Sequence, residues 1–189
     1  MRKVILLMHV SLDGFTAGPK GEMNWIKVDD EMFEIVSRLT NESDTALFGR
    51  VTYKMMESYW PNAGKEPNAS KHDIEHADWL NNNEKIVFSD TLKETPWEKT
   101  TIMNGNIKEK IESLKKQPGK NMLMIGSTET AHLFMQNELI DEYFININPV
   151  VLGEGKPMFK DIKNKINLKL ISSTSFKSGV VGLHYETIK

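Results

Sequence analysis

The sequence predicts one α/β domain over residues 1–189, built on a mixed, mostly parallel sheet with helices on both faces. Two observations support this fold class. Short apolar runs alternate with segments of helical periodicity over the first two-thirds of the chain. The last third contains strand-like runs with no convincing helix between them. The sheet should therefore end in antiparallel strands.

The elements of the first part follow from apolar runs and helical spacing. An aliphatic run predicts a strand at Lys3–Val10, and a Gly- and Pro-rich loop follows it. The acids Asp29 to Glu31 suit a helix N-terminus, and apolar residues then recur at helical spacing up to Leu39. A second strand is expected at Asp44–Phe48. The helix after it should stop at Pro61.

The rest of the chain continues the alternation and then changes to strands. Helices are expected at Lys71–Asn82, behind a capping-box pattern at Asn106 to Glu109, and around Ala131, Phe134 and Met135. Further strands are expected at Lys85–Phe88, Thr100–Met103, Met122–Ile125, Glu142–Pro149, Leu168–Ser175 and Val180–Ile188. The sequence "FKSG" between the last two strands is a hairpin signal.

Composition excludes several classes of function. The chain carries 24 Lys and Arg against 26 Asp and Glu, and this net charge of -2 argues against general binding to nucleic acid or a membrane surface. It has no cysteine, which excludes disulfides and thiolate chemistry. The apolar run at the N-terminus contains His9 and lacks a small-residue cleavage pattern, which favours a buried strand over a signal peptide. We expect a cytoplasmic protein whose partner is a small molecule.

The junction between the second strand and the second helix carries Gly49, Arg50 and Thr52. A helix N-terminus offers backbone N–H groups and a positive dipole end to an anion, and here a guanidinium and a hydroxyl lie beside it. Gly49 would let a ligand approach the backbone closely. The alternative is an ordinary turn in which Arg50 is solvated and Thr52 caps the helix. This stretch alone does not decide between the two.

Two more strand ends resemble this junction. Gly126, Ser127 and Thr128 stand between a strand and a helix, and Ser89 follows the strand that ends at Phe88. Ligands of open α/β sheets lie across the carboxyl ends of the strands, where all three junctions fall. Together they favour a dinucleotide site, although the full G-x-G-x-x-G pattern is absent.

Two carboxylates and two histidines are further candidates. Asp13 and Asp30 could border one pocket, but a turn Asp before Gly14 and a helix-start Asp are the alternatives. His72 and His76 have the i,i+4 spacing that suits a metal on a helix. No partner motif accompanies them, so we interpret them as part of a solvated helix face and predict no metal site.

Five segments resemble one family and occur in its order. They are "SLDGF", "LFGRVTYKMMESYWP", "KIVFSDTL", "MLMIGSTETAHLF" and "ELIDEYFININPVVLGEGKPMF". The family is the dihydrofolate reductase-like superfamily, in its branch similar to the RibD C-terminal domain of riboflavin biosynthesis, and the resemblance covers Val4 to Tyr185. It implies a three-layer α/β/α fold with an eight-stranded sheet. It also implies a homodimer and NADPH as hydride donor, with NADH as a possible substitute.

The resemblance also implies roles for individual residues. Phosphate and pyrophosphate contacts fall to Gly49, Arg50, Thr52, Gly126, Ser127 and Thr128. Ser89 would lie near the adenosine 2′-phosphate, and Gly153 and Gly155 near the cofactor. Asp13, Gly14, Trp25 and Asp30 would face the nicotinamide or the substrate. One departure is Asp90, which stands where relatives carry a basic residue. If solvated, its carboxylate would repel a 2′-phosphate by roughly 1 kcal/mol.

We therefore expect an NAD(P)H-dependent reductase of a small heterocycle, similar to 5-amino-6-(5-phosphoribosylamino)uracil reductase or dihydrofolate reductase. Asp13, or a water that it orders, is the predicted proton donor. The alternative is a non-catalytic, nucleotide-binding homodimer that keeps the fold without turnover. The apolar stretch Tyr143–Leu152 could pair subunits or could be a buried strand, and periodicity does not distinguish the two.

Overall fold

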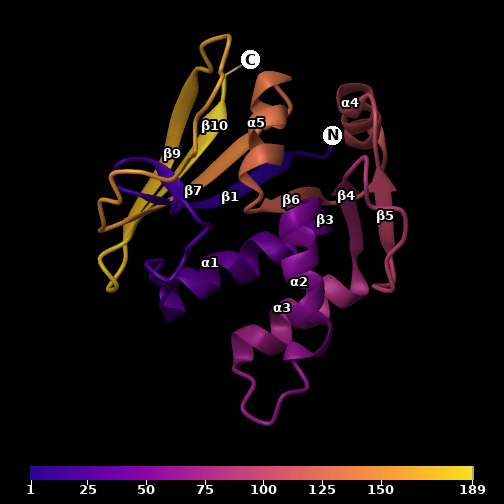
Figure 1. Cartoon of the computed structure of the whole chain (residues 1–189), viewed down its shortest axis with the longest axis horizontal. Coiled ribbons are helices and arrows are strands. Elements are labelled where there is room, and N and C mark those ends of the chain that lie inside the picture. The colour runs from indigo at the N-terminus through magenta and orange to yellow at the C-terminus, as the bar shows by residue number, and fades with distance from the viewer. Residues whose placement is uncertain (189) are drawn as a thin grey trace.

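The strands of the computed structural model, which describes residues 1–188, form one large sheet and one small sheet. The large sheet contains β1 (Val4–Ser11), β3 (Ser43–Gly49), β4 (Glu84–Phe88), β5 (Thr100–Met103), β6 (Asn121–Ile125), β7 (Glu142–Asn148), β9 (Leu168–Ser175) and β10 (Val181–Thr187). Their order is β5-β4-β3-β6-β1-β7-β10-β9 (Figure 1). All neighbours from β5 to β7 run parallel, whereas β10 is antiparallel to β7 and to β9. The predicted mixed sheet is confirmed.

Helices cover both faces of this sheet (Figure 1). They are α1 (Asp30–Asn41), α2 (Arg50–Ala63), α3 (Lys71–Asn82), α4 (Ile107–Lys116) and α5 (Thr128–Gln136). One face packs on α1 to α3 and the other on α4 and α5. The predicted three-layer arrangement is therefore confirmed. No helix within residues 1–188 is long and apolar enough to cross a bilayer.

The second helix does not end at Pro61, so that prediction is wrong. α2 continues to Ala63. A proline inside a helix lacks one N–H donor and crowds the preceding turn. Pro61 stands in the last turn of α2, so it removes one backbone hydrogen bond and only Asn62 and Ala63 follow it in the helix. Its carbonyl also accepts a hydrogen bond from the Asn81 side chain of α3, at 3.3 Å.

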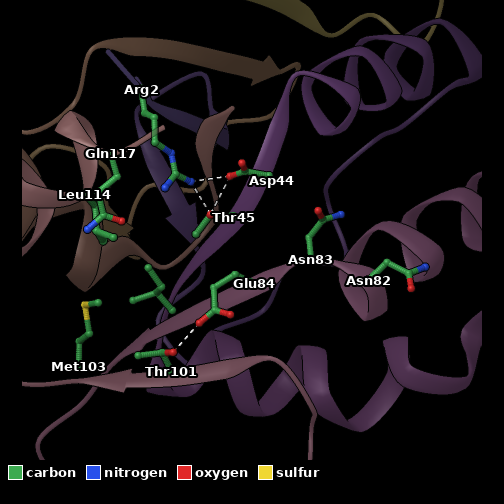
Figure 2. Close-up of a pocket in the computed structure, with 11 residues that line it drawn as sticks. Arg2, Asp44, Thr45, Asn82, Asn83, Glu84, Thr101, Met103, Leu114 and Gln117 are labelled. Atoms are coloured by element: carbon green, nitrogen blue, oxygen red, sulfur yellow. Dashed lines mark hydrogen bonds and ion pairs between the residues drawn. The ribbon is translucent and has the colours of Figure 1, made fainter. Parts of the chain in front are cut away.

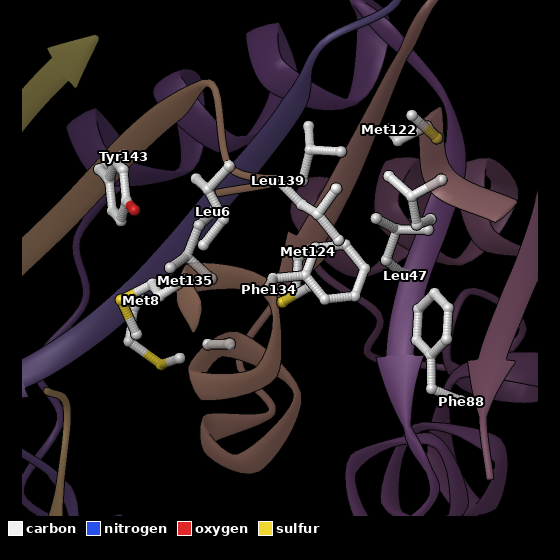
Figure 3. Close-up of a cluster of buried hydrophobic side chains, with 14 of the residues drawn as sticks. Leu6, Met8, Leu47, Phe88, Met122, Met124, Phe134, Met135, Leu139 and Tyr143 are labelled. Carbon is white, nitrogen blue, oxygen red and sulfur yellow. The ribbon is translucent and has the colours of Figure 1, made fainter. Parts of the chain in front are cut away.

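The large core cluster lies between the sheet and α4 and α5 (Figure 3). Side chains of a strand alternate between its two faces. Leu6 and Met8 of β1 therefore pack against Phe134 of α5, whereas Ile5 and Leu7 belong to the cluster under α1 to α3. Burial of each such side chain is worth roughly 1.5–3 kcal/mol, so β1 is fixed from both sides.

The small sheet pairs β2 (Phe15–Ala17) with β8 (Lys156–Pro157), antiparallel. The sequence predicted a loop where β2 lies, so that prediction is wrong there, and it predicted no strand at Lys156–Pro157. A Cβ on Gly155 would come closer than 3.0 Å to the carbonyl oxygen of Ala17, so this pairing requires glycine there. The small sheet brings Lys156 beside the loop that follows β1.

β7 lies in the interior of the large sheet, between β1 and β10. Tyr143 and Phe144 are buried there. The stretch Tyr143–Leu152 therefore begins as a buried strand, as one of the two alternatives stated. Both edges of β7 are already paired with strands of the same chain.

Candidate active site

A cavity of about 760 Å³ opens at the carboxyl ends of the parallel strands. Its walls come from the ends of β1, β3 and β6, from the loop after β2, and from α1, α2, α3 and the start of α5. This volume is typical of small-molecule and cofactor sites. Two parts of the cavity differ in character. One part is polar and lies at the starts of α2 and α5, and the other is apolar and lies among α1, α2 and α3.

The polar part contains two helix N-termini that lack a side-chain cap. Side-chain oxygens cap α1, α3 and α4. By contrast, Gly49 and Ser127, the N-cap residues of α2 and α5, make no side-chain cap hydrogen bond. Within residues 1–188, the N–H groups of Arg50, Val51, Thr128 and Glu129 have no hydrogen-bond partner. These open donors, together with the positive ends of two helix dipoles, are an anion-binding arrangement.

The two helix starts are held side by side. The backbone N–H of Gly49 donates to Ser127 Oγ at 2.9 Å, and Ser127 Oγ donates to Thr130 Oγ1 at 2.8 Å. A Cβ on Gly49 would come closer than 3.0 Å to both hydroxyl oxygens. Glycine is therefore required at position 49 because the α5 turn packs directly against its backbone. The reason predicted from the sequence was instead the close approach of a ligand to Gly49.

The turn at the start of α5 is strained. Gly126 and Ser127 both have left-handed backbones, with φ of 68° and 69°. Glycine adopts this conformation freely, but serine does so at a cost of about 1–3 kcal/mol. The Thr128 hydroxyl next to it lies 2.7 Å from Thr16 Oγ1 of β2. The structure thus brings together the predicted residues Gly49, Arg50, Thr52, Gly126, Ser127 and Thr128 around one cavity.

Positive charge predominates at the polar part. Arg50, Lys20 and Lys156 line the cavity, and Glu129 is the one acid among the lining residues within 1–188. Arg50 is exposed and has no hydrogen-bond or ion-pair partner in this part of the chain. The stated alternative for this junction had Thr52 capping α2, and this capping is not found, because the cap position is Gly49.

The apolar part is formed by three helices. Its walls include Met32, Phe33 and Val36 of α1, and Met55, Met56 and Trp60 of α2. Ile26 and Val28, from the loop before α1, close one side. Methionine and aromatic side chains adapt to flat, apolar ligands.

His72 and His76 complete the apolar part, which corrects their interpretation as a solvated helix face. His72 stacks on Phe33 with ring centroids 4.0 Å apart, and His76 lies 4.4 Å from the Trp60 ring. Burial lowers the pKa of His76 to about 3 and also lowers the pKa of His72, so both imidazoles are neutral near pH 7. No cluster of three or more His, Cys, Asp or Glu that could hold a metal is found within residues 1–188.

Asp13 lies outside this cavity and is not among its lining residues. Its carboxylate accepts hydrogen bonds from Ser11 Oγ at 2.6 Å and from the backbone N–H groups of Leu152 and Gly153 at 3.1 and 2.7 Å. These bonds lower the pKa of Asp13 to about 2, the Ser11 bond most strongly. An aspartate that is ionised at neutral pH cannot donate a proton. Asp13 thus holds the loop after β7, and the prediction that a water ordered by Asp13 delivers the proton stays a prediction.

Several other predicted residues lie near the cavity without lining it. Asp30 is the exposed first residue of α1, and its neighbour Asp29 caps the helix instead. Trp25 Nε1 donates to the carbonyl of Glu22 at 3.0 Å. Ser89 follows Phe88, which does line the cavity, and Ser89 Oγ accepts from the N–H of Leu92 at 2.9 Å. Gly14, Gly153 and Gly155 shape the loops that carry β2 and β8.

Sequence reasoning missed several lining residues, among them His9, Thr16, Thr130 and Lys156. His9 was noted only as a polar residue in an apolar strand. Its position near the carboxyl end of β1, next to the predicted junctions, was a signal that could have identified it. Lys156 had no such signal, because it reaches the cavity only through the pairing of β2 with β8.

A second cavity, of about 410 Å³, lies at the opposite, amino-terminal edge of the large sheet. Figure 2 shows that its charged groups are already engaged. The Arg2 guanidinium contacts Asp44 and donates to Thr45 Oγ1 at 2.6 Å, and Glu84 accepts a hydrogen bond from Thr101. This second cavity thus offers no free charge comparable to Arg50, and the cavity at the carboxyl edge is the better candidate.

Comparison with known proteins agrees with this architecture. Residues 2–182 match the model of the RibD C-terminal domain. The chain is 38% identical to the uncharacterized protein YyaP of Bacillus subtilis (strain 168) over 184 residues, which cover 97% of this chain and 94% of that protein.

Two solved structures share the fold. One is a Shewanella sp. PV-4 protein provisionally assigned to riboflavin biosynthesis, with a TM-score of 0.75, 23% identity and coverage of 99% of both chains. The other is dihydrofolate reductase from Enterococcus faecalis in complex with NADP(H) and RAB-propyl. Its TM-score is 0.63 at 13% identity, with 99% of this chain and 97% of that chain covered. These likenesses show a dihydrofolate reductase-like fold.

Proposed function

Because this chain belongs to the RibD C-terminal domain family, we propose that it is an NAD(P)H-dependent reductase of a small heterocyclic substrate. Reductases such as dihydrofolate reductase share its fold, which supports a reductase-type function. One observation carries the proposal for this chain: two helix N-termini without a side-chain cap, at Gly49 and Ser127, converge on one cavity. The guanidinium of Arg50 lies beside them and has no ion-pair partner within residues 1–188.

The polar part of the cavity suits the phosphates of a dinucleotide. The open N–H groups at the starts of α2 and α5 would hold a pyrophosphate, and the Thr52 and Thr128 hydroxyls would add donors. Arg50 would pair with a phosphate by two parallel hydrogen bonds. The exposed carboxylate of Asp90 disfavours a 2′-phosphate nearby, so Arg50 is the proposed determinant for NADPH over NADH.

Bound NAD(P)H would supply a hydride, and hydride transfer needs no nucleophile from the protein. The chain's own task is to hold two rings together and to exclude water. The apolar part between α1, α2 and α3 would bind the substrate ring. Lys20 and Lys156 line the same cavity and carry no ion pair within residues 1–188. They would accommodate the phosphate of 5-amino-6-(5-phosphoribosylamino)uracil, whereas dihydrofolate would rely on the apolar walls.

Binding of the dinucleotide tests this proposal first. Trp60 lines the cavity, so titration with NADPH should quench tryptophan fluorescence or cause energy transfer from tryptophan to the nicotinamide. If the protein binds neither NADPH nor NADH at millimolar concentration, the proposal that it is a reductase is refuted. Oxidation of NADPH with each of the two named substrates then separates an enzyme from the alternative, a non-catalytic nucleotide-binding protein, which would bind without turnover.

We also propose a homodimer. β9 is an edge strand of the large sheet, and its side chains Leu170 and Ile171 are 51% and 46% exposed. An edge strand with exposed apolar side chains is a common pairing surface. Light scattering coupled to gel filtration tests the proposal directly, since a monomer mass at micromolar concentration would contradict it.

A further inference from the structure

His9 is the one polar side chain that β1 contributes to the cavity. It lies two residues beyond Leu7, whose carbonyl accepts a hydrogen bond from the N–H of Gly126 at 3.1 Å. His9 therefore lies beside the turn that starts α5 and on the same strand face as Leu7, which packs under α1 to α3. This position is where the polar and apolar parts of the cavity meet.

Asn148 at the end of β7 determines which nitrogen of His9 carries hydrogen. The backbone N–H of Lys27 donates to Asn148 at 2.8 Å, so the atom that accepts it must be the amide oxygen. The amide nitrogen then faces Val10 O at 3.4 Å, Asn146 O at 3.2 Å and His9 Nδ1 at 3.4 Å. Two of these neighbours are carbonyl oxygens, which confirms that the NH₂ group points this way.

An NH₂ group can only donate. A hydrogen on Nδ1 of His9 would therefore point at a group that cannot accept it, so the 3.4 Å contact favours a bare Nδ1. Burial lowers the pKa of His9 to about 4, which keeps the imidazole neutral near pH 7. A neutral imidazole with a bare Nδ1 carries its hydrogen on Nε2. Asn148 is fully buried, so this arrangement is shielded from water.

The Nε2–H of His9 is left without a partner and reaches open space. Within residues 1–188 no hydrogen bond engages this nitrogen. It is also absent from the fully buried, unpartnered side-chain atoms of this part of the chain, which are Ser43 Oγ, His76 Nδ1 and Ser178 Oγ. An unpaired Nε2 that is not buried, on a side chain that lines the cavity, must be accessible from the cavity.

We propose that the Nε2–H of His9 donates a hydrogen bond to a carbonyl oxygen or ring nitrogen of a flat, uncharged heterocycle bound in the apolar part of the cavity. Phe33, Trp60 and the two α3 histidines supply faces for such a ring. The one lining acid within residues 1–188, Glu129, belongs to α5 and not to the three helices that form the apolar part. Asn148 is then a positioning residue: it fixes the tautomer of His9, and through Lys27 it fixes the loop that carries Ile26 and Val28. The inference rests on the proposed function for the identity of the site, but its test needs no turnover.

Two probes of similar shape separate the hydrogen bond from ring burial. Lumazine (pteridine-2,4-dione) has carbonyl and ring-nitrogen acceptors, and naphthalene has two fused rings without any. Replacement of His9 by Phe keeps a ring and removes the donor. Loss of one hydrogen bond should weaken lumazine binding about tenfold. The affinities of His9→Phe for naphthalene and for NADPH should stay within about twofold of the wild-type values. His9→Gln, whose amide places an N–H near the position of Nε2, should restore most of the lumazine affinity.

Each outcome decides the proposal. Equal loss of both probes in His9→Phe would mean that the histidine only shapes the wall. If His9→Phe loses NADPH affinity but binds lumazine unchanged, His9 donates to the nicotinamide carboxamide and not to the substrate, and the proposal is overturned. Failure of wild-type protein to bind lumazine at millimolar concentration would also overturn it. If NADPH does not bind but lumazine binding still depends on His9, the proposed function fails and this inference survives.

The tautomer can be measured without any ligand. Nitrogen-15 chemical shifts of the histidine rings should show the hydrogen of His9 on Nε2 from pH 6 to pH 8. A hydrogen on Nδ1 would contradict the geometry at Asn148 and refute the proposal even where a substituted protein fails to fold.

Discussion

The backbone N–H of Gly49 donates a hydrogen bond to Ser127 Oγ at 2.9 Å, which joins the start of α2 directly to the start of α5. The two residues are 78 positions apart in the sequence. Their contact places two positive helix ends on one cavity, and the proposed dinucleotide site depends on it.

Gly49→Ala should damage this contact. The new Cβ would come closer than 3.0 Å to Ser127 Oγ and Thr130 Oγ1. Overpacking of this kind costs about 1–3 kcal/mol and would push the two helix starts apart. We expect a lower free energy of unfolding and at least tenfold weaker NADPH binding, measured by chemical denaturation and by tryptophan fluorescence.

Gly105→Ala is the matched control for that substitution. Gly105 has a φ of 74° and nothing within 4 Å of an added Cβ, and it does not line the cavity. Alanine there should cost stability through backbone strain alone. A comparable loss of NADPH affinity in both variants would mean that general destabilisation, and not the position of α5, is responsible.

Arg50→Ala should discriminate between the two dinucleotides. If Arg50 pairs with the 2′-phosphate, its loss removes charge-assisted hydrogen bonds and should weaken NADPH binding about tenfold or more. NADH binding should change by less than about threefold. Lys54→Ala is the control, because Lys54 lies one turn further along α2 and is already paired with Glu57 at 2.6 Å. Equal losses for NADPH and NADH would assign Arg50 to a phosphate that both cofactors share.

Asp13→Asn tests whether Asp13 acts on the substrate or holds a loop. Asn keeps one acceptor oxygen for the N–H groups of Leu152 and Gly153 but loses the charge. Since the pKa of Asp13 is about 2, it carries no proton to give at neutral pH. We expect turnover to fall less than tenfold, with an unchanged pH profile of kcat/KM. If one ionisation seen in the wild-type profile of kcat/KM is missing in Asp13→Asn, Asp13 is the proton donor.

Buried neutral histidines should make the protein lose stability as pH falls. The pKa of His76 is about 3 in the folded chain against 6.5 as its ordinary value, so below pH 6.5 the unfolded chain binds the extra proton. Stability therefore rises with pH between about 3 and 6.5 and is lost on acidification, by roughly 1.4 kcal/mol per pH unit for one such histidine. His9 adds to this effect above its pKa of about 4.

His76→Leu should reduce that pH dependence. Leucine fits the apolar surroundings and cannot titrate, so the change in free energy of unfolding between pH 5.0 and pH 6.5 should shrink by about 2 kcal/mol. Urea denaturation at pH 5.0 and at pH 6.5 measures this change in the free energy of unfolding. Carboxylates whose pKa is lowered stay ionised at both pH values and do not contribute to it. An unchanged slope in the variant would mean that His76 is not buried in the neutral form.

The amino-acid sequence by itself determined the order and type of the main elements. Apolar runs and helical spacing act over a few residues, so β1, α1, α3 and the hairpin of β9 and β10 could be predicted from neighbours in the chain. Glycine and serine at the strand ends also marked Gly49 and Gly126 to Thr128, because the carboxyl ends of parallel strands meet at one edge of a sheet.

Only the tertiary structure decided which side chains face the cavity. Asp13 was predicted to be a catalytic carboxylate, and only the structure shows that it also holds a loop through Leu152 and Gly153, about 140 positions away. His76 looked solvated until α3 packed against Trp60. His9 became a candidate donor only through Asn148, on a neighbouring strand. Side-chain roles depend on burial and on partners distant in sequence, and strand register and helix packing set both.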